Sequence, residues 1–267
     1  MATDPKETLV RFLGTMRPIT LGEMDSIKLM NRIDSKYCTD MDTLLSVLAD
    51  ADRHGYRVLE VEGLRLSPYN SMYYDTDTLG MFLDHHNRRL VRQKVRTRVY
   101  VVSGQTFLEI KRKNNKGRTK KKRMEIPASD FADFRTNPEA DEFLTRISGY
   151  IPEHLKPRME TLFDRITLVN AAKTERLTID THLRFVNHDT GVEAGLGPAV
   201  IIELKQDGRA ESEMKGILLD HRVKPIRVSK YCIGTTITNP HVKSGRFKVK
   251  VRRIEKVIHE KIKIATI

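Results

Sequence analysis

The spacing of apolar residues along the chain changes near residue 56. Before that point the segments 4–16, 20–31 and 41–54 have the pattern of helices. After it, apolar and polar residues alternate every second position in many short runs, which is typical of strands. We expect strands at 56–61, 69–75, 90–101, 105–113, 119–126, 160–171, 174–186 and 198–206.

Three further helices interrupt these strands, at 78–87, 128–148 and 210–221, and Pro127 is expected in the first turn of the second. Many strands joined by short connections, with separate helices, indicate an α+β class. We expect an antiparallel β-barrel with flanking helices.

No low-complexity linker divides the chain, so we expect a single domain over residues 1–267. Its core is expected at about 30–236, and 237–267 forms a basic C-terminal extension that alternates like a strand before becoming helix-like. The N-terminus has no basic region followed by an apolar run, and no stretch is apolar enough to span a membrane. We therefore expect a cytoplasmic protein without a transmembrane segment.

The net charge points to an anionic partner. Lys and Arg total 48 against 35 Asp and Glu, which leaves a formal charge of +13. This excess does not by itself distinguish nucleic acid, an anionic membrane surface and a small polyphosphate, because all three respond to the same long-range potential. The positions of the cations in the sequence must distinguish these three kinds of partner.

The cations of one predicted strand share a face. Arg92, Lys94, Arg96 and Arg98 occupy alternate positions, and Val91, Val95 and Val99 fall on the other face. Successive side chains of a strand point to opposite faces, so one face of this strand is basic. A solvated face usually mixes charges of both signs, and this one contains no acid.

The same alternation recurs in neighbouring segments, at Glu109-Ile110-Lys111 and at Glu203-Leu204-Lys205. Closing such strands into a barrel would direct cations from several strands towards one ligand. The sequence thus predicts an electropositive tunnel, and residues 107–126 read as a hairpin that turns at Asn114 to Gly117.

Two carboxylates, Glu109 and Glu203, stand out in these basic strands. Glu109 is expected to pair with neighbouring cations. A carboxylate in a basic tunnel can instead hold Mg²⁺ or Mn²⁺, which use one or two carboxylates together with phosphate oxygens. Other chemistry is not indicated: the sequence has no P-loop, HExxH or GxSxG motif, and His85 and His86 are expected to face solvent from a helix.

An ordered set of short motifs carries a family resemblance: RIDSKY (32–37), YYDT (73–76), RTRVY (96–100), EIKRK (109–113), KKRM (121–124), DRITLV (164–169), ERLTIDT (175–181), IELK (202–205) and RVSKY (227–231). Together they resemble the polyphosphate polymerase domain of the vacuolar transporter chaperone (VTC) family, within the triphosphate tunnel metalloenzymes. The resemblance implies a β-barrel whose lumen binds nucleotide and polyphosphate.

The resemblance implies roles for individual residues. The metal ligand, for Mn²⁺ or Mg²⁺, is Glu203. The residues expected to clamp the transferring phosphoryl group are Arg96, Arg98, Arg165 and Arg176. Those expected to bind phosphate along the tunnel are Lys36, Lys111, Lys121, Lys205, Arg227 and Lys230, although Lys120, Lys121 and Lys122 are interchangeable in alignment.

The implied activity is an ATP:polyphosphate phosphotransferase that adds the γ-phosphoryl group of ATP to a growing chain. Hydrolases of the related CYTH branch begin with a Glu-x-Glu-x-Lys motif, and Glu60-Val61-Glu62 is not followed by that lysine, so synthesis is favoured. A triphosphate or polyphosphate hydrolase, an inactive polyphosphate-binding protein and a nucleic-acid-binding module remain as alternatives. The expected ligands are ATP and inorganic polyphosphate, without nucleic acid, and a membrane-protein partner in trans would account for recruitment to a membrane.

Overall fold

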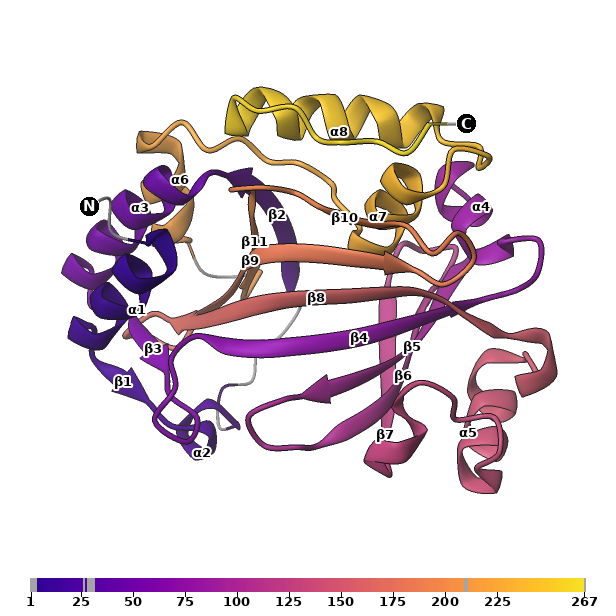
Figure 1. Ribbon diagram of the computed structural model, residues 1–267. Coiled ribbons are helices and arrows are strands. Elements are labelled where there is room, and N and C mark those ends of the chain that lie inside the picture. Colours follow the sequence, from indigo (N-terminus) through magenta and orange to yellow (C-terminus); the bar gives the residue numbers. More distant parts are fainter. Residues whose placement is uncertain (1–3, 26, 28–31, 209–210, 267) are drawn as a thin grey trace.

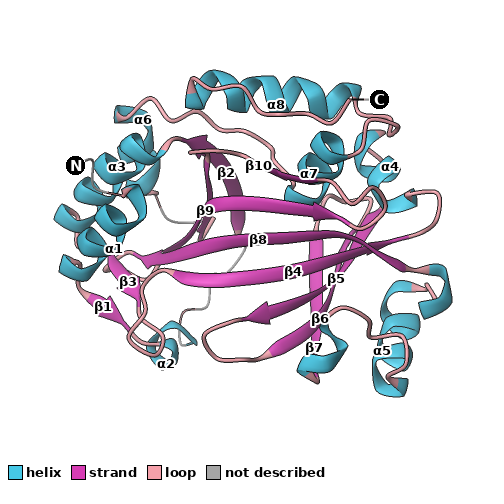
Figure 2. Ribbon diagram, in the orientation of Figure 1, coloured by secondary structure: helices cyan, strands magenta, loops and turns pink. Residues whose placement is uncertain are grey.

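A curled antiparallel sheet forms the centre of the molecule (Figures 1 and 2). The computed structural model describes residues 4–25, 27, 32–208 and 211–266. The strands are β1 (Pro18–Ile19), β2 (Ile33–Thr39), β3 (Arg57–Leu59), β4 (Ser67–Asp75), β5 (Arg92–Tyr100), β6 (Thr106–Lys113), β7 (Thr119–Ile126), β8 (Lys156–Val169), β9 (Glu175–Asn187), β10 (Glu193–Gly195) and β11 (Val200–Gln206). Each predicted strand is present, with ends that differ by a few residues.

The main path of the sheet runs β2-β11-β9-β8-β4-β5-β6-β7. Its neighbours are antiparallel, and β1 and β3 form a short parallel pair at its margin. Within the described part of the chain, β2 and β7 end this path and do not pair with each other. The expected barrel is therefore an open, curled half-barrel, and its concave side, called the lumen below, holds α7, whose Tyr231 stacks on Tyr73 of β4 with ring centroids 5.3 Å apart.

The helices surround the sheet in three groups (Figure 1). They are α1 (Pro5–Thr15), α2 (Leu21–Asp25), α3 (Met41–Arg53), α4 (Gly80–His86), α5 (Pro138–Ser148), α6 (Glu213–Asp220), α7 (Lys230–Thr238) and α8 (Gly245–Ile258), with 3₁₀ turns η1 (Ala128–Phe131) and η2 (Pro152–His154). Apolar clusters join α1, α3 and α6 to one part of the sheet, α4, α7 and α8 to a second, and α5 to β4, β5 and β6.

Several helix predictions need correction. The helix expected at 128–148 divides into η1 and α5, and its first-turn proline is Pro138 rather than Pro127. The helix expected at 20–31 ends at Asp25 in the described residues, and most of the remainder lies outside them. The start of the helix expected at 210–221 also lies outside the described residues.

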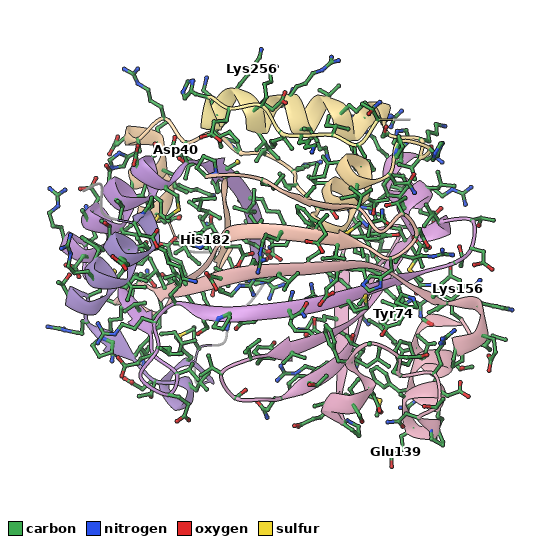
Figure 3. The ribbon with its side chains drawn as sticks, viewed as in Figure 1. Asp40, Tyr74, Glu139, Lys156, His182 and Lys256 are labelled. Atoms are coloured by element: carbon green, nitrogen blue, oxygen red, sulfur yellow. The ribbon has the colours of Figure 1, made fainter. Side chains whose placement is uncertain are left out.

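The C-terminal stretch is helical where its alternation resembles a strand. Buried residues of α8 are spaced four, three and four positions apart, at Phe247, Val251, Ile254 and Ile258. Val249, which completes the apparent alternation, is 50% exposed. The outer face of α8 is basic, and Lys256 projects from it in Figure 3. No helix in the described part of the chain is long and apolar enough to cross a membrane.

A bulge in β9 divides the lumen into a polar and an apolar part. The pairing with β8 gains one residue of β9 between Thr181 and Arg184, and His182 (Figure 3) has a φ of 51°. An inserted residue reverses the facing of the side chains that follow it. Asp180 therefore faces the cations of the lumen, whereas Phe185, beyond the bulge, packs against α7.

Candidate functional site

The pairing register aligns the charged residues of neighbouring strands on the lumen side. Lys94 and Arg96 of β5 lie opposite Lys111 and Glu109 of β6. The alternate residues of β6, such as Ile110, are buried in the cluster under α5. The basic face predicted from alternation is thus the concave face of the sheet.

Glu203 of β11 lies between two lysines. Its Oε2 accepts a hydrogen bond from Lys36 Nζ of β2 at 3.0 Å, and its Oε1 lies 3.6 Å from Lys205 Nζ. Burial would raise the pKa of Glu203, but Lys36 and Lys205 outweigh it and hold the carboxyl well below its usual range. Burial lowers the pKa of Lys205 to about 8 despite the attraction of Glu203. Glu203 is therefore ionised and available to a cation.

Asp180 of β9 pairs with two of the predicted phosphate ligands. It accepts hydrogen bonds from Arg165 Nε at 2.6 Å and Nη2 at 2.9 Å, and another from Lys230 Nζ at the first residue of α7. Burial lowers the pKa of Lys230 to about 8, against the attraction of Asp180. Asp180, which the sequence reasoning missed, thus joins β8 to α7 across the lumen.

Glu109 of β6 pairs with cations on both neighbouring strands. It accepts hydrogen bonds from Arg96 Nε at 2.8 Å and from Lys121 Nζ at 2.5 Å. Lys121 lies opposite Lys111 in the pairing of β6 with β7. The expected pairing of Glu109 is confirmed, and Lys121 is the residue of the 120–122 run that faces the lumen.

Arg98 is a buried cation without a carboxylate partner among the described residues. It is 5% exposed, its Nε donates to Ser71 Oγ at 2.8 Å, and its guanidinium lies 5.5 Å from the Tyr69 ring and 5.6 Å from the Phe163 ring. An unpaired buried charge is costly. A bound anion would remove that cost.

Lys94 and Tyr73 are lumen residues that were not assigned from the sequence. Lys94 Nζ donates to Ser229 Oγ, the N-cap of α7, at 2.7 Å. Tyr73 accepts a hydrogen bond from Arg96 Nη1 at 2.8 Å. Burial would raise the pKa of Tyr73, but Arg96 and neighbouring cations outweigh it and lower the pKa to about 7. The alternation through Lys94 and Arg96 was a signal for Lys94, whereas Tyr73 stood in the YYDT motif (73–76) without an assigned role.

Two predicted ligands lie away from these ion pairs. Arg176 is half-buried opposite Lys205, and burial lowers its pKa. Arg227 is exposed in the segment before α7 and has no ion pair among the described residues. Arg176 and Arg227 thus extend the basic surface beyond the central carboxylates.

A divalent cation that arrives with phosphate fits the surroundings of Glu203. The described residues contain no group of three His, Cys, Asp or Glu side chains that could hold a metal. Thr178, opposite Glu203 on β9, has a buried hydroxyl oxygen without a hydrogen-bond partner. One carboxylate and one hydroxyl suit Mg²⁺ or Mn²⁺ whose remaining ligands are phosphate and water.

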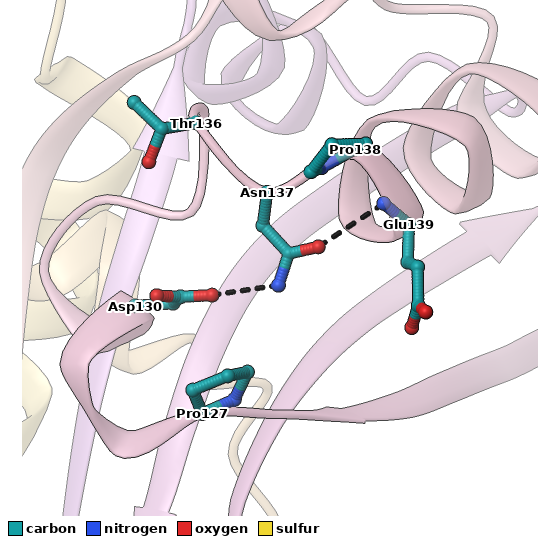
Figure 4. Close-up of a pocket in the computed structure, with 6 residues that line it drawn as sticks. All are labelled: Pro127, Asp130, Thr136, Asn137, Pro138 and Glu139. Atoms are coloured by element: carbon teal, nitrogen blue, oxygen red, sulfur yellow. Dashed lines mark hydrogen bonds between the residues drawn. The ribbon is translucent and has the colours of Figure 1, made fainter.

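A surface pocket between η1 and α5 has a different chemistry (Figure 4). Its lining includes Asp130 and Glu139 and no cation. Asn137 Nδ2 donates to Asp130 Oδ2 at 2.7 Å, and Asn137 Oδ1 accepts from the Glu139 backbone nitrogen at 3.1 Å, so these groups cap α5. The pocket does not suit a polyanion.

Comparison with known proteins agrees with this architecture. None of the curated proteins compared with the chain matches it. A candidate adenylate cyclase from Bacillus halodurans aligns at 14% identity with a TM-score of 0.50, over 82% of this chain and 99% of that one. A candidate adenylyl cyclase from Hippeastrum, described as having a dominant triphosphatase activity, aligns at 14% identity and a TM-score of 0.50, over 76% and 94%. These two likenesses show the triphosphate tunnel fold.

The family itself is shown by the sequence. The model of the VTC domain matches residues 31–239, which span β2 to α7 and include every side chain placed in the lumen above. With the half-barrel, the basic concave face and this match in agreement, the chain belongs to the VTC domain family.

Proposed function

We propose that the protein is a polyphosphate polymerase, an ATP:polyphosphate phosphotransferase that works in the lumen of its half-barrel. The observation that carries the proposal is a lumen whose described residues include more cations than carboxylates, and in which Arg98 is buried without an acidic partner among those residues. A phosphate chain neutralises such a surface along its whole length. Membership of the VTC family supports polyphosphate as that chain.

The proposed reaction needs positioning more than acid–base chemistry. A terminal oxygen of the polyphosphate chain attacks the γ-phosphorus of ATP, the new P–O bond forms, the bond from the γ-phosphorus to the β,γ-bridging oxygen breaks, and ADP leaves. The attacking phosphate is already ionised near neutral pH, so no side chain has to remove a proton.

The roles of the cations follow from their positions. Arg96 and Arg98 come from β5 and Arg165 from β8, the two strands that flank β4, and these three residues can hold the oxygens of the transferring group. Arg176 lies further along β9. Forked guanidinium donors suit phosphate oxygens, and their charge offsets the negative charge dispersed in the transition state. The phosphates on either side of the reacting group would bind Lys36, Lys111, Lys121, Lys205, Arg227 and Lys230.

Glu203 and Thr178 would hold the Mg²⁺ or Mn²⁺ that accompanies the triphosphate. Such an ion neutralises phosphate charge and orients the γ-phosphoryl group. The lysines around Glu203 would then turn from the carboxylate to the phosphates.

The test is incubation of the purified protein with ATP and Mn²⁺, followed by a gel stained for polyphosphate and a parallel measurement of free phosphate. Long product supports the proposal. Free phosphate alone would make the protein a hydrolase, and neither product would make it a binding protein.

Glu203→Gln tests the metal role. It should lower the rate at least ~100-fold, as expected for loss of a group that organises transition-state charge, and should raise the Mn²⁺ concentration needed for half-maximal rate. Glu125→Gln, which removes an exposed carboxylate of β7, is the matched control. Full metal-dependent activity in Glu203→Gln would refute the assignment.

A further inference from the structure

A second group of cations lies where the lumen row of β5 reaches the surface beside α4 and α8. We call it the mouth cluster, and it consists of Arg88, Arg92, Lys113, Arg227 and Lys250. Arg88 and Arg227 are exposed and the other three are half-buried. The cluster is thus open to solvent, unlike Arg98 at the buried end of the same row.

The pairing of β5 with β6 makes the mouth cluster continuous with the lumen. Arg92 and Lys113 lie directly opposite each other, two residues along from the pair formed by Lys94 and Lys111. Pairs two residues apart on a strand are roughly 7 Å apart. A linear polyanion leaving the lumen along β5 would meet Arg92 and Lys113 next.

The loop before α7 brings Arg227 to the same place. Lys94 Nζ donates to Ser229 Oγ at 2.7 Å, and Ser229 follows Arg227 by two residues. Burial and the positive charges of Arg92 and Arg227 lower the pKa of Lys113. Residues far apart in the sequence therefore share one local field.

The packing of α8 on α4 completes the cluster. The Phe247 ring of α8 lies 5.3 Å from the Phe82 ring and 5.5 Å from His86 of α4, while Lys250 Nζ lies 5.3 Å from the Phe247 ring. Arg88 lies two residues after the end of α4, next to its C-cap Asn87. The C-terminal helix thereby adds a cation to the edge of the sheet.

His85 and His86 differ from expectation at this site. His86 is 5% exposed and packed on α8, and His85 is half-buried. Burial, with Lys94 and Arg92 nearby, holds the pKa of His85 far below its usual range. A neutral His85 adds no charge to the mouth.

In the part of the chain that the structure describes, no carboxylate pairs with the mouth cluster. Among the described residues none of its five members forms an ion pair, whereas the adjacent Arg89 pairs with Asp84 at 3.2 Å. Arg32, which lies near Arg176 and away from the mouth cluster, likewise has a counter-charge, because its Nε lies 2.6 Å from Asp34 Oδ1. Like charges held together without counter-charges are destabilising unless an anion binds.

We propose that the mouth cluster is a second polyphosphate-binding site, which holds the part of a long chain that extends out of the lumen. The identity of the ligand rests on the proposed function. The cluster would make affinity depend on chain length, because tripolyphosphate fits within the lumen whereas a longer chain also reaches Arg88, Lys113 and Lys250.

The experiment compares binding of tripolyphosphate and of a long polyphosphate to wild type and to the double variant Arg88→Gln/Lys250→Gln, without metal or ATP. Two exposed phosphate contacts are lost, each of modest strength, so long-chain affinity should fall roughly tenfold for the pair, which corresponds to about 1.4 kcal/mol. The slope of log affinity against log salt should fall by about two. Tripolyphosphate affinity should change less than about twofold, because distant charges are screened.

The control is Lys120→Gln/Lys122→Gln, which removes two exposed cations from the other face of β7. It should leave long-chain binding unchanged. The proposal is overturned if the mouth variant binds the long chain as wild type does, if it weakens both ligands equally, or if the control weakens long-chain binding as much. Equal competition by a single-stranded oligonucleotide would also overturn it.

These outcomes are independent of turnover. If wild type makes no polymer but the mouth variant alone binds the long chain more weakly, the mouth site is supported and the polymerase proposal is refuted. A polymerase whose mouth variant binds the long chain normally refutes the mouth site alone.

Discussion

Replacing Asp180 with asparagine would show how much the buried lumen cations destabilise the fold when they lack a counter-charge, apart from their role in binding phosphate. Asp180 is the carboxylate that neutralises Arg165 and Lys230, and the exposed fractions of the three side chains are 4%, 14% and 13%. Removing one partner of a buried pair costs about 3–5 kcal/mol, because the other charges remain buried. At about 2 °C per kcal/mol for a chain of this length, Tm should fall by roughly 6–10 °C.

Tripolyphosphate should reverse much of this loss. In Asp180→Asn, Arg165 and Lys230 no longer bind a carboxylate, so phosphate oxygens compete with nothing for them. A ligand at 100 times its Kd stabilises by about 2.7 kcal/mol, and tighter binding raises that figure. The rise in Tm with tripolyphosphate, followed by differential scanning fluorimetry, should therefore be larger in the variant than in wild type.

Asp164→Asn is the matched control, because Asp164 precedes Arg165 on β8 and pairs instead with Lys6 at 2.8 Å and His182 at 3.1 Å. It should lose less stability and show the wild-type response to tripolyphosphate. The reasoning fails if Asp180→Asn is as stable as wild type, or if its response to tripolyphosphate is no larger.

Two further predictions concern pH and packing. Lys205 and Lys230, whose pKa values are about 8, must be protonated to bind phosphate. Tripolyphosphate affinity should therefore fall from pH 7 to pH 9, by up to about tenfold per lysine per pH unit above the pKa. Calorimetry in buffers of different ionisation enthalpy counts the protons taken up on binding, and a pH-independent affinity would contradict this prediction. Gly234→Ala in α7 should lower stability by about 1–3 kcal/mol in thermal melts, because its Cβ would lie 2.6 Å from the Phe185 ring, whereas Gly216→Ala meets nothing within 4 Å and should not.

The strands of the lumen were predictable because their alternation is regular. β5 places Lys94, Arg96 and Arg98 on one face and β6 alternates Leu108 and Ile110 with Glu109 and Lys111, and the sequence alone therefore indicated which side chains of these strands share a surface. The turn at Asn114 to Gly117 was also predictable. The Gly117 backbone nitrogen donates a hydrogen bond to the Asn114 carbonyl oxygen at 3.1 Å, and Gly117 has a φ of 78°.

Other elements could not be read in this way. β2 ends in the three consecutive buried residues Tyr37, Cys38 and Thr39 and shows no alternation. The helix α7 is buried from Tyr231 to Thr238, so it has no amphipathic pattern either. The pairing of Asp180 with Lys230 depends on two segments that meet only in the folded chain, and no local signal specifies it.

The pairing of β2 has a consequence for how the protein is made. Its residues align with β11, from Thr39 opposite Val200 to Ile33 opposite Gln206, so an early strand joins the sheet through β11, which comes last in the sequence among the described strands. At 5–20 residues per second, synthesis of the intervening chain takes on the order of ten seconds. During that time the apolar side chains of β2 have no partner strand, and Lys36 cannot meet Glu203. The nascent protein therefore completes the charged surface of its lumen only after β11 has left the ribosome, and a ribosome stalled before that point would display a sheet edge open to wrong pairing.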